Sequence, residues 1–93
     1  MTNFKQGYIY FIVDYTNYKA KIGYSKFPQQ RLKQLSTGYP GKLELAKVIP
    51  GTVKDERKYH QVFCHSKICR EWFTLTPEIE EFISRKAGKA NAA

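Results

Sequence analysis

The chain has 93 residues, of which 42% are hydrophobic and 15% aromatic, and its formal net charge is +8 at pH 7. A chain of this length is expected to form one domain with one modest core, and its apolar content excludes disorder over most of the length. No apolar run approaches the roughly 20 residues of a membrane span, and residues 1–6 lack the features of a secretory signal, so we expect a cytoplasmic protein without a membrane partner. The excess of positive charge favours a polyanionic partner, with nucleic acid as the first candidate.

Residues 7–24 are predicted to form a β-hairpin. Apolar side chains alternate along both strands, at Ile9, Phe11, Val13, Ala20 and Ile22. The register that gathers these side chains on one face also places Tyr10 on the opposite face together with Lys21. The turn is expected at residues 15–18, where Asn17 can adopt the left-handed backbone that tight turns need. A hydroxyl and an ammonium group on one face suit phosphate binding.

Residues 28–36 are predicted to form the first helix, with Gly38 at its C-terminal cap. Leu32 and Leu35 form the buried side of this helix. Arg31 lies at the edge of that side, where a guanidinium group can reach back toward the sheet. The alternative for Arg31 is an ordinary solvated charge on the helix surface.

Four further elements follow: a strand over residues 43–49, a helix over residues 53–64, a short strand over residues 71–75 and a helix that begins at Pro77. We expect residues 1–85 to form the single domain and residues 86–93 a flexible basic tail. Trp72 is assigned to the core or its rim, with base stacking as the alternative.

The predicted helix over residues 53–64 carries ionisable groups on its inward side. The residues at helical spacing on this side are Val53, Glu56, Tyr59, His60 and Phe63. A carboxylate there is costly without a cation or a metal ion, so Glu56 is the residue most in need of a functional explanation. The alternatives are a solvated carboxylate for Glu56 and, for His60, an imidazole at the core edge with a local hydrogen bond.

Cys64 and Cys69 are the only cysteines of the chain. We expect reduced thiols that are buried or half-buried. His60 and His65 are close in sequence, so a zinc site is the alternative. The spacing of these four residues does not match a standard zinc finger or ribbon, which favours the thiol interpretation.

The order of these motifs resembles the GIY-YIG endonuclease superfamily over residues 7–83. The residues that carry the resemblance are Tyr8-Ile9-Tyr10, Lys21-Ile22-Gly23, Arg31 and Glu56. A further set resembles a short phage and bacterial branch of this superfamily: Leu32, Leu35, Gly38, Pro40, His60, Phe63, Glu71, Trp72 and Phe73.

The resemblance implies a small α/β/α layer with a central three-stranded antiparallel sheet flanked by helices. It implies that Tyr10 acts as general base or orients the attacking water, that Arg31 clamps the scissile phosphate, and that Glu56 holds Mg²⁺ or Mn²⁺. Lys21 stands where the second motif usually has a tyrosine, and His60 is expected to support the metal shell or to move a proton. Three more residues are expected to contact the nucleic acid: Tyr8, Lys19 and Lys33.

The chain also differs from the family pattern. Tyr8 replaces the glycine of the first motif, and no asparagine or glutamine lies between Gln61 and Asn91, although many members have one near the active site. The sequence predicts a divalent-metal-dependent DNA endonuclease of low intrinsic sequence specificity, in a bacterial or phage-infected cell. A partner protein or a homodimer is expected to supply specificity. The alternative is a catalytically inactive nucleic-acid-binding or phage-encoded inhibitory module that retains the nuclease fold.

Overall fold

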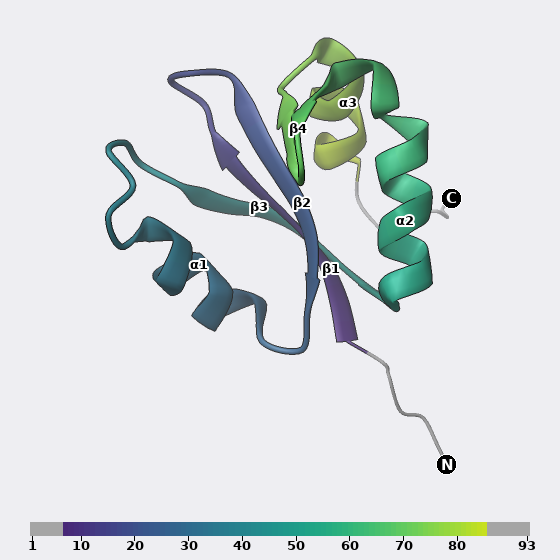
Figure 1. Ribbon diagram of the computed structural model, residues 1–93, viewed down its shortest axis with the longest axis horizontal. Helices are drawn as coiled ribbons and strands as arrows, with labels where there is room; N and C mark the ends of the chain where they lie inside the picture. Colours follow the sequence, from purple (N-terminus) through teal and green to yellow (C-terminus); the bar gives the residue numbers. More distant parts are fainter. Residues whose placement is uncertain (1–6, 86–93) are drawn as a thin grey trace.

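Five strands and three helices are formed by residues 7–85, the part of the chain that the computed structural model describes. In chain order the elements are β1 (Gly7–Asp14), β2 (Lys19–Ser25), α1 (Pro28–Ser36), β3 (Glu44–Gly51), α2 (Val53–Val62), a 3₁₀ turn η1 (Cys64–Ser66), β4 (Lys67–Cys69), β5 (Trp72–Thr74) and α3 (Pro77–Ser84). The strands form one antiparallel sheet in the order β3-β1-β2-β5-β4, so the β1-β2 hairpin runs through its middle (Figure 1). The predicted basic tail at residues 86–93 lies outside the described residues.

The prediction of a three-stranded sheet is wrong. β5 pairs with the free edge of β2, and β4 pairs with β5, so two short strands extend the sheet on that side. Each has three residues, and β4 is exposed along its whole length. Strands this short do not show the apolar alternation by which a sequence reveals a longer strand. The chain nevertheless keeps a small α/β fold.

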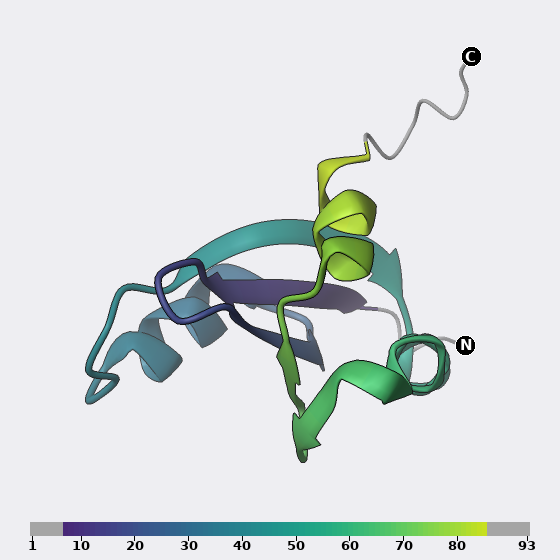
Figure 2. The same ribbon diagram turned by 90° about the horizontal axis from the view of Figure 1, so that it is seen from above.

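Different helices cover the two faces of the sheet (Figures 1 and 2). On one face, α2 and α3 cover the larger apolar cluster, whose fully buried members are Ile9, Phe11, Val13, Ala20, Ile22, Phe73 and Ile79. On the other face, α1 covers a smaller cluster built around Tyr10, Ile12 and Leu43. Burying a large apolar side chain stabilises a fold by about 1.5–3 kcal/mol. Most of the apolar stabilisation therefore comes from the face under α2 and α3.

The helix ends follow local signals. α1 begins at Pro28 and ends at Ser36 as predicted, and Gly38 just beyond it has a φ of +81°, which glycine adopts without strain. α2 ends at Val62, before the predicted end at residue 64, and η1 follows it. Thr52 and Asp55 form a capping box at the start of α2.

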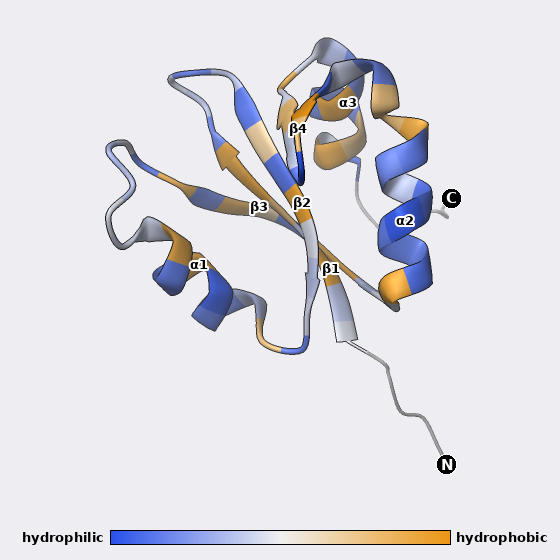
Figure 3. Ribbon diagram, in the orientation of Figure 1, coloured by the Kyte–Doolittle hydropathy of each residue, from blue (hydrophilic) through white to orange (hydrophobic). Residues whose placement is uncertain are grey.

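Hydrophobic and hydrophilic residues are distributed unevenly over the helices and strands. Most of α2 is hydrophilic apart from the exposed valines at its ends, Val53 and Val62, and hydrophobic residues are frequent on the strands and on α3 (Figure 3). No residue of α2 is fully buried, so this helix lies on the sheet with only one side. Among residues 7–85, no helix has the length and apolar character needed to span a membrane.

Candidate functional site

The pairing of β1 with β2 confirms the predicted register of the hairpin. Tyr10 lies opposite Gly23, and Ile12 lies opposite Lys21. Directly paired residues in an antiparallel sheet point to the same side. Tyr10 and Lys21 therefore share the face that α1 covers.

Tyr10 is tied to α1 by a hydrogen bond. Arg31 donates from Nε to the Tyr10 hydroxyl oxygen at 3.3 Å, and from Nη1 to Gln34 Oε1 at 3.2 Å. Leu32 and Leu35 hold this helix in place, because both pack against the apolar cluster around Tyr10. The helix thus brings the Arg31 guanidinium to the sheet, as its position at the edge of the apolar side predicted.

Gly23 makes room for the Tyr10 hydroxyl group. A methyl group at residue 23 would lie 2.5 Å from Tyr10 Cζ and 3.0 Å from Glu71 Oε1. Both distances are shorter than a carbon atom tolerates without a shift of its neighbours. Glycine at this position lets the tyrosine side chain cross β2 and meet the glutamate on the far side.

The environment of Tyr10 keeps its hydroxyl group protonated. Burial raises the pKa of Tyr10, and the negative charges of Glu71 and Glu56 raise it further, although the hydrogen bond from Arg31 acts in the opposite direction. A phenolate would be favoured only if the influences that lower the pKa of Tyr10 outweighed those that raise it. The structure therefore favours a neutral hydroxyl group for Tyr10 over a phenolate.

Lys21 is held between a carboxylate and an aromatic ring. Its side chain is 11% exposed, its Nζ lies 3.3 Å from Glu71 Oε1, and the same Nζ lies 5.2 Å from the centre of the Trp72 ring. The ion pair and the cation–π contact both fix the ammonium group on the face that carries Tyr10.

Glu71 is the residue at this site that the sequence did not predict. Its carbonyl oxygen accepts a 3.0 Å hydrogen bond from the Ile22 amide, which places its side chain beside Lys21 and Gly23. Glu71 and Ile22 meet only because β5 pairs with β2. The sequence analysis named Glu71 only as part of a predicted strand and of the motif that it forms with Trp72 and Phe73, and neither signal reveals its partner.

Glu56 and His60 come from α2 and complete the group. Their side chains are 16% and 19% exposed, and Glu56 Oε2 lies 3.8 Å from His60 Nε2. Burial raises the pKa of Glu56, and the charge of Glu71 adds to this, while His60, Arg57 and Lys21 lower it. The balance is an upward shift. Glu56 is therefore a carboxylate whose negative charge is not fully compensated by the cations around it.

His60 also holds α2 on the sheet. Its Nε2 lies 2.8 Å from the Ile22 carbonyl oxygen, which can only accept, so Nε2 carries the proton. Its ring meets the edge of Phe73 at 5.0 Å. This geometry matches the predicted alternative of a histidine at the core edge with a local hydrogen bond, and it occupies Nε2 as a proton donor to the backbone.

Six side chains from five parts of the chain thus meet, and we call them the polar cluster: Tyr10, Lys21, Arg31, Glu56, His60 and Glu71. The Arg31–Tyr10 hydrogen bond, the Lys21–Glu71 ion pair, the Glu56–His60 contact and the mutual effects on pKa join them into one group. The cluster contains all five predicted catalytic residues. Glu71 is its sixth member.

The donor set suits a hard divalent cation with few protein ligands. Glu56 is an undercompensated carboxylate close to Glu71, and such an oxygen donor suits Mg²⁺, which keeps several water molecules and takes one or two carboxylates from a protein. Among residues 7–85, no group of three or more His, Cys, Asp or Glu side chains could hold a metal ion.

A structural zinc site needs about four protein ligands, so the zinc alternative has no support in this region. The predicted burial of Cys64 and Cys69 is wrong, because both thiols are exposed.

The predicted nucleic-acid contacts lie in two places. Tyr8 and Lys19 are exposed and belong to the face of the sheet that carries Tyr10 and Lys21. Lys33 is exposed on α1, where it lines a hollow with Gln29, Gln30 and Leu32.

A second hydrogen-bonded group lies at the hairpin turn, which occupies residues 15–18 as predicted. Asp14 accepts hydrogen bonds from the Thr16 and Asn17 amides at 3.0 and 3.1 Å, from Asn17 Nδ2 at 2.8 Å and from the Tyr39 hydroxyl at 2.5 Å. The Tyr39 and Asn17 bonds lower the pKa of Asp14 to about 2, while burial and Asp14 raise the pKa of Tyr39 to about 12. The left-handed residue of the turn is Tyr18, with a φ of 55°, so the prediction for Asn17 is wrong: Asn17 binds Asp14 instead.

Comparison with known protein families gives a match over most of the chain. Residues 7–86 match the T5orf172 domain, a phage-associated domain related to nuclease-like folds. No curated protein and no solved structure matches the chain significantly. The finer resemblance to the GIY-YIG superfamily stays a prediction. Because the match covers nearly the whole chain and all of the polar cluster, the chain belongs to the T5orf172 domain family.

Proposed function

We propose that this domain is a divalent-metal-dependent DNA endonuclease that hydrolyses phosphodiester bonds in the manner of the GIY-YIG superfamily. The observation that carries the proposal is the Arg31–Tyr10 hydrogen bond beside the undercompensated carboxylate of Glu56. A phosphodiester cut needs a cation for the phosphate, a group that orients water and a carboxylate for a metal ion. The polar cluster contains at least one of each, on a chain of net charge +8.

Arg31 is assigned to the scissile phosphate. Two of its N–H groups are used, on Tyr10 and Gln34, and the remaining N–H groups of the fork can bind phosphate oxygens. Lys21 adds a second positive charge on the same face of the sheet, although its pairing with Glu71 limits its reach. Lys21 is therefore assigned to electrostatic stabilisation, and not to proton transfer.

Tyr10 is assigned to the orientation of the attacking water. Arg31 donates to its oxygen, so the tyrosine proton remains available for a water or phosphate oxygen. Its raised pKa argues against a phenolate base. His60 is assigned to positioning, because its Nε2–H is bound to the Ile22 carbonyl while its ring lies beside Glu56.

Glu56 is assigned as the metal ligand, with Mg²⁺ or Mn²⁺ as the ion. A bound divalent cation stabilises the charge that develops on phosphate and lowers the pKa of water. Burial and the charge of Glu71 disfavour the ionised form of this carboxylate, although His60, Arg57 and Lys21 act in the opposite direction. A cation bound to Glu56 would offset this cost.

We propose low intrinsic sequence specificity. The groups of the cluster are suited to phosphate oxygens, and contacts to phosphates position a nucleic acid without reading its sequence. A partner protein or a second copy of the chain would then select the target site.

The test is incubation of supercoiled plasmid with purified protein and Mg²⁺ or Mn²⁺, and in parallel with a chelator. We expect metal-dependent nicking or cutting that is lost in Glu56→Ala and Arg31→Ala. The matched controls are Glu81→Ala and Arg85→Ala, because these two residues form an exposed ion pair on and beside α3. Both controls should cut like the unmodified protein.

The alternative function is a module that binds nucleic acid without turnover. The pairing of Lys21 with Glu71 favours this alternative, since it ties up one of the two cations of the cluster. DNA binding that is equal for the unmodified protein and Glu56→Ala, with no cleavage under either metal, would overturn the endonuclease proposal in its favour.

A further inference from the structure

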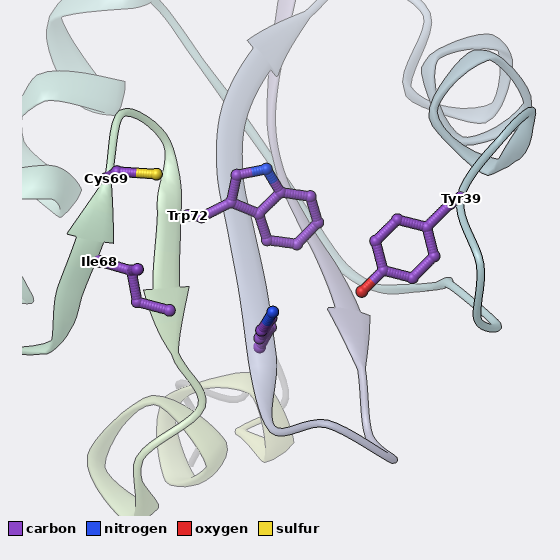
Figure 4. Close-up of a pocket in the computed structure, with 5 residues that line it drawn as sticks. Tyr39, Ile68, Cys69 and Trp72 are labelled. Atoms are coloured by element: carbon purple, nitrogen blue, oxygen red, sulfur yellow. The ribbon is translucent and has the colours of Figure 1, made fainter.

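A pocket opens on the face of the sheet that carries Lys21, outside the polar cluster. It has a volume of about 280 Å³ and is lined by Lys19, Tyr39, Ile68, Cys69 and Trp72. Tyr39 points toward Trp72, and Ile68 and Cys69 lie on the other side of the indole, on β4 (Figure 4). The volume is just below the roughly 300–1,000 Å³ of typical small-molecule sites, so one flat ring system is a suitable occupant.

The aromatic walls are fixed before any ligand arrives. The rings of Tyr39 and Trp72 are nearly parallel, with an angle of 16° and a centroid distance of 6.0 Å. The 2.5 Å bond to Asp14 anchors the Tyr39 hydroxyl, and the turn amides hold Asp14 in turn. A wall that is already ordered lowers the entropy cost of binding.

Trp72 connects this pocket to the polar cluster. Its ring lies 5.2 Å from Lys21 Nζ, and Lys21 pairs with Trp72 across the β2-β5 register. Lys19 lines the pocket and provides a second ammonium group, which is exposed, unlike that of Lys21. Apolar aromatic walls therefore adjoin two cations, which is the complement of a planar ring joined to an anion.

We propose that this pocket receives an unpaired nucleobase of a DNA strand whose phosphate lies on the polar cluster. The inference rests on the proposed function and adds a substrate class: single-stranded or locally unpaired DNA in preference to intact duplex. A base inside a duplex is stacked on both sides and cannot reach the indole, whereas a free base has an exposed π-face of the kind that aromatic side chains bind. The high net positive charge of the chain favours binding of the phosphate backbone to which the base is attached.

Trp72 is the only tryptophan of the chain, so the unmodified protein reports directly on the pocket. The experiment adds single-stranded oligo-dT, a duplex of equal length and an abasic oligonucleotide of equal charge, all in the presence of chelator. We expect strong quenching of indole fluorescence by oligo-dT and little by the duplex or the abasic strand. Equal quenching by the abasic strand, or no quenching by oligo-dT, would overturn the proposal.

A matched pair of variants tests the location. Ile68 is 51% exposed in the pocket, and Val62 is 59% exposed on α2, so Ile68→Glu and Val62→Glu change the charge equally at sites that tolerate polar groups. We expect Ile68→Glu to weaken oligo-dT binding by about 10-fold or more, in line with the loss of one stacked base, and Val62→Glu to change it far less. Equal weakening by both variants would place the bound base elsewhere.

The outcome is separable from that of the endonuclease test. Both binding measurements are made without metal, so they do not depend on cleavage. If the unmodified protein does not cleave plasmid but shows base-dependent quenching, the endonuclease proposal is overturned and the proposal of a base pocket stands. If the protein cleaves plasmid without base-dependent quenching, the endonuclease proposal stands and the proposal of a base pocket is overturned.

Discussion

The two faces of the β1-β2 hairpin are made by alternate residues of the same strands, yet they have different roles. On the face under α2 and α3, Ile9, Phe11 and Val13 are completely buried among other apolar side chains. On the face under α1, Tyr10 and Lys21 are also buried, but both have polar partners. One face stabilises the fold, and the other holds polar groups in place.

The difference shows in the energetics of burial. On the apolar face each buried side chain contributes favourably. Beside the polar face, burial raises the pKa of both Tyr10 and Glu56, which means that it disfavours their ionised forms. The polar cluster, to which α2 contributes Glu56 and His60, is thus tolerated by a fold that the larger apolar cluster stabilises.

The largest effect is expected on the apolar face. Phe73→Ala should lower the free energy of unfolding by about 3–5 kcal/mol, because Phe73 is completely buried and its removal leaves a cavity. Urea unfolding followed by circular dichroism measures this change. On the other face, Tyr10→Phe removes one hydrogen bond and should cost less than about 1.5 kcal/mol. A larger loss for Tyr10→Phe than for Phe73→Ala would contradict the division of roles.

Glu56→Gln should separate function from stability. Under the proposed function, cleavage falls by about 100-fold or more, since a metal ligand is lost. At the same time the melting temperature at pH 7 should rise. The folded protein holds the Glu56 proton more tightly than the unfolded chain does, so the ionised carboxylate disfavours folding.

The sign of this effect can be checked by pH. The cost of the charge appears as the pH rises through the raised pKa of folded Glu56, so the gain in Glu56→Gln should vanish below about pH 4, the ordinary pKa of glutamate. Thermal melts of both proteins across this range provide the comparison. A lower melting temperature for Glu56→Gln at pH 7 would show that its carboxylate stabilises the fold.

Gly23→Ala tests the crossing of Tyr10 over β2. The added methyl group must displace the Tyr10 ring and would also press against the Glu71 carboxylate, so the proposed cleavage should fall by about 10- to 100-fold, and the fold should lose about 1–3 kcal/mol. Gly38→Ala is the matched control, because it has open space around it but a positive φ. It should cost about 1–2 kcal/mol of stability and leave cleavage unchanged. Equal cleavage by both variants would remove Tyr10 from the proposed reaction.

The smallest effect concerns Asp14 and depends on acid. Its pKa is about 2 in the folded protein, well below the usual value of about 3.9, so its ionised form stabilises the fold above pH 4 and this contribution is lost as the pH falls toward 2. Asp14→Asn should therefore lower the melting temperature at pH 7 and converge on the unmodified protein near pH 2. If the difference in melting temperature between the two proteins were the same at all pH values, the effect of Asp14→Asn would be due to the changed shape of the side chain and not to its charge.

The sequence predicted those parts of the molecule that depend on neighbours along the chain. The alternation in residues 7–24 determines which way Tyr10 and Lys21 face, and the apolar side of α1 determines where Arg31 points. These features need only local periodicity and one hairpin. For the same reason α1 was predicted to the residue.

The parts that were missed depend on residues far apart in sequence. Glu71 joins the cluster only through the β2-β5 pairing, and Tyr39 reaches Asp14 across 25 positions. β4 is three exposed residues whose pairing is set by its neighbour β5. Local propensity contains none of this information. The number of strands and the sixth member of the cluster therefore required the structure.

The pairing of β5 with β2 has a consequence for the order of assembly. The hairpin and α1 can bring Tyr10, Lys21 and Arg31 together from the first 36 residues of the chain. Glu71 and Trp72 arrive only when β5 has been synthesised and has closed on β2. Until then Lys21 lacks both its carboxylate and its aromatic partner. A chain that has been synthesised only as far as α2 therefore carries an incomplete cluster, which is completed when β5 pairs with β2.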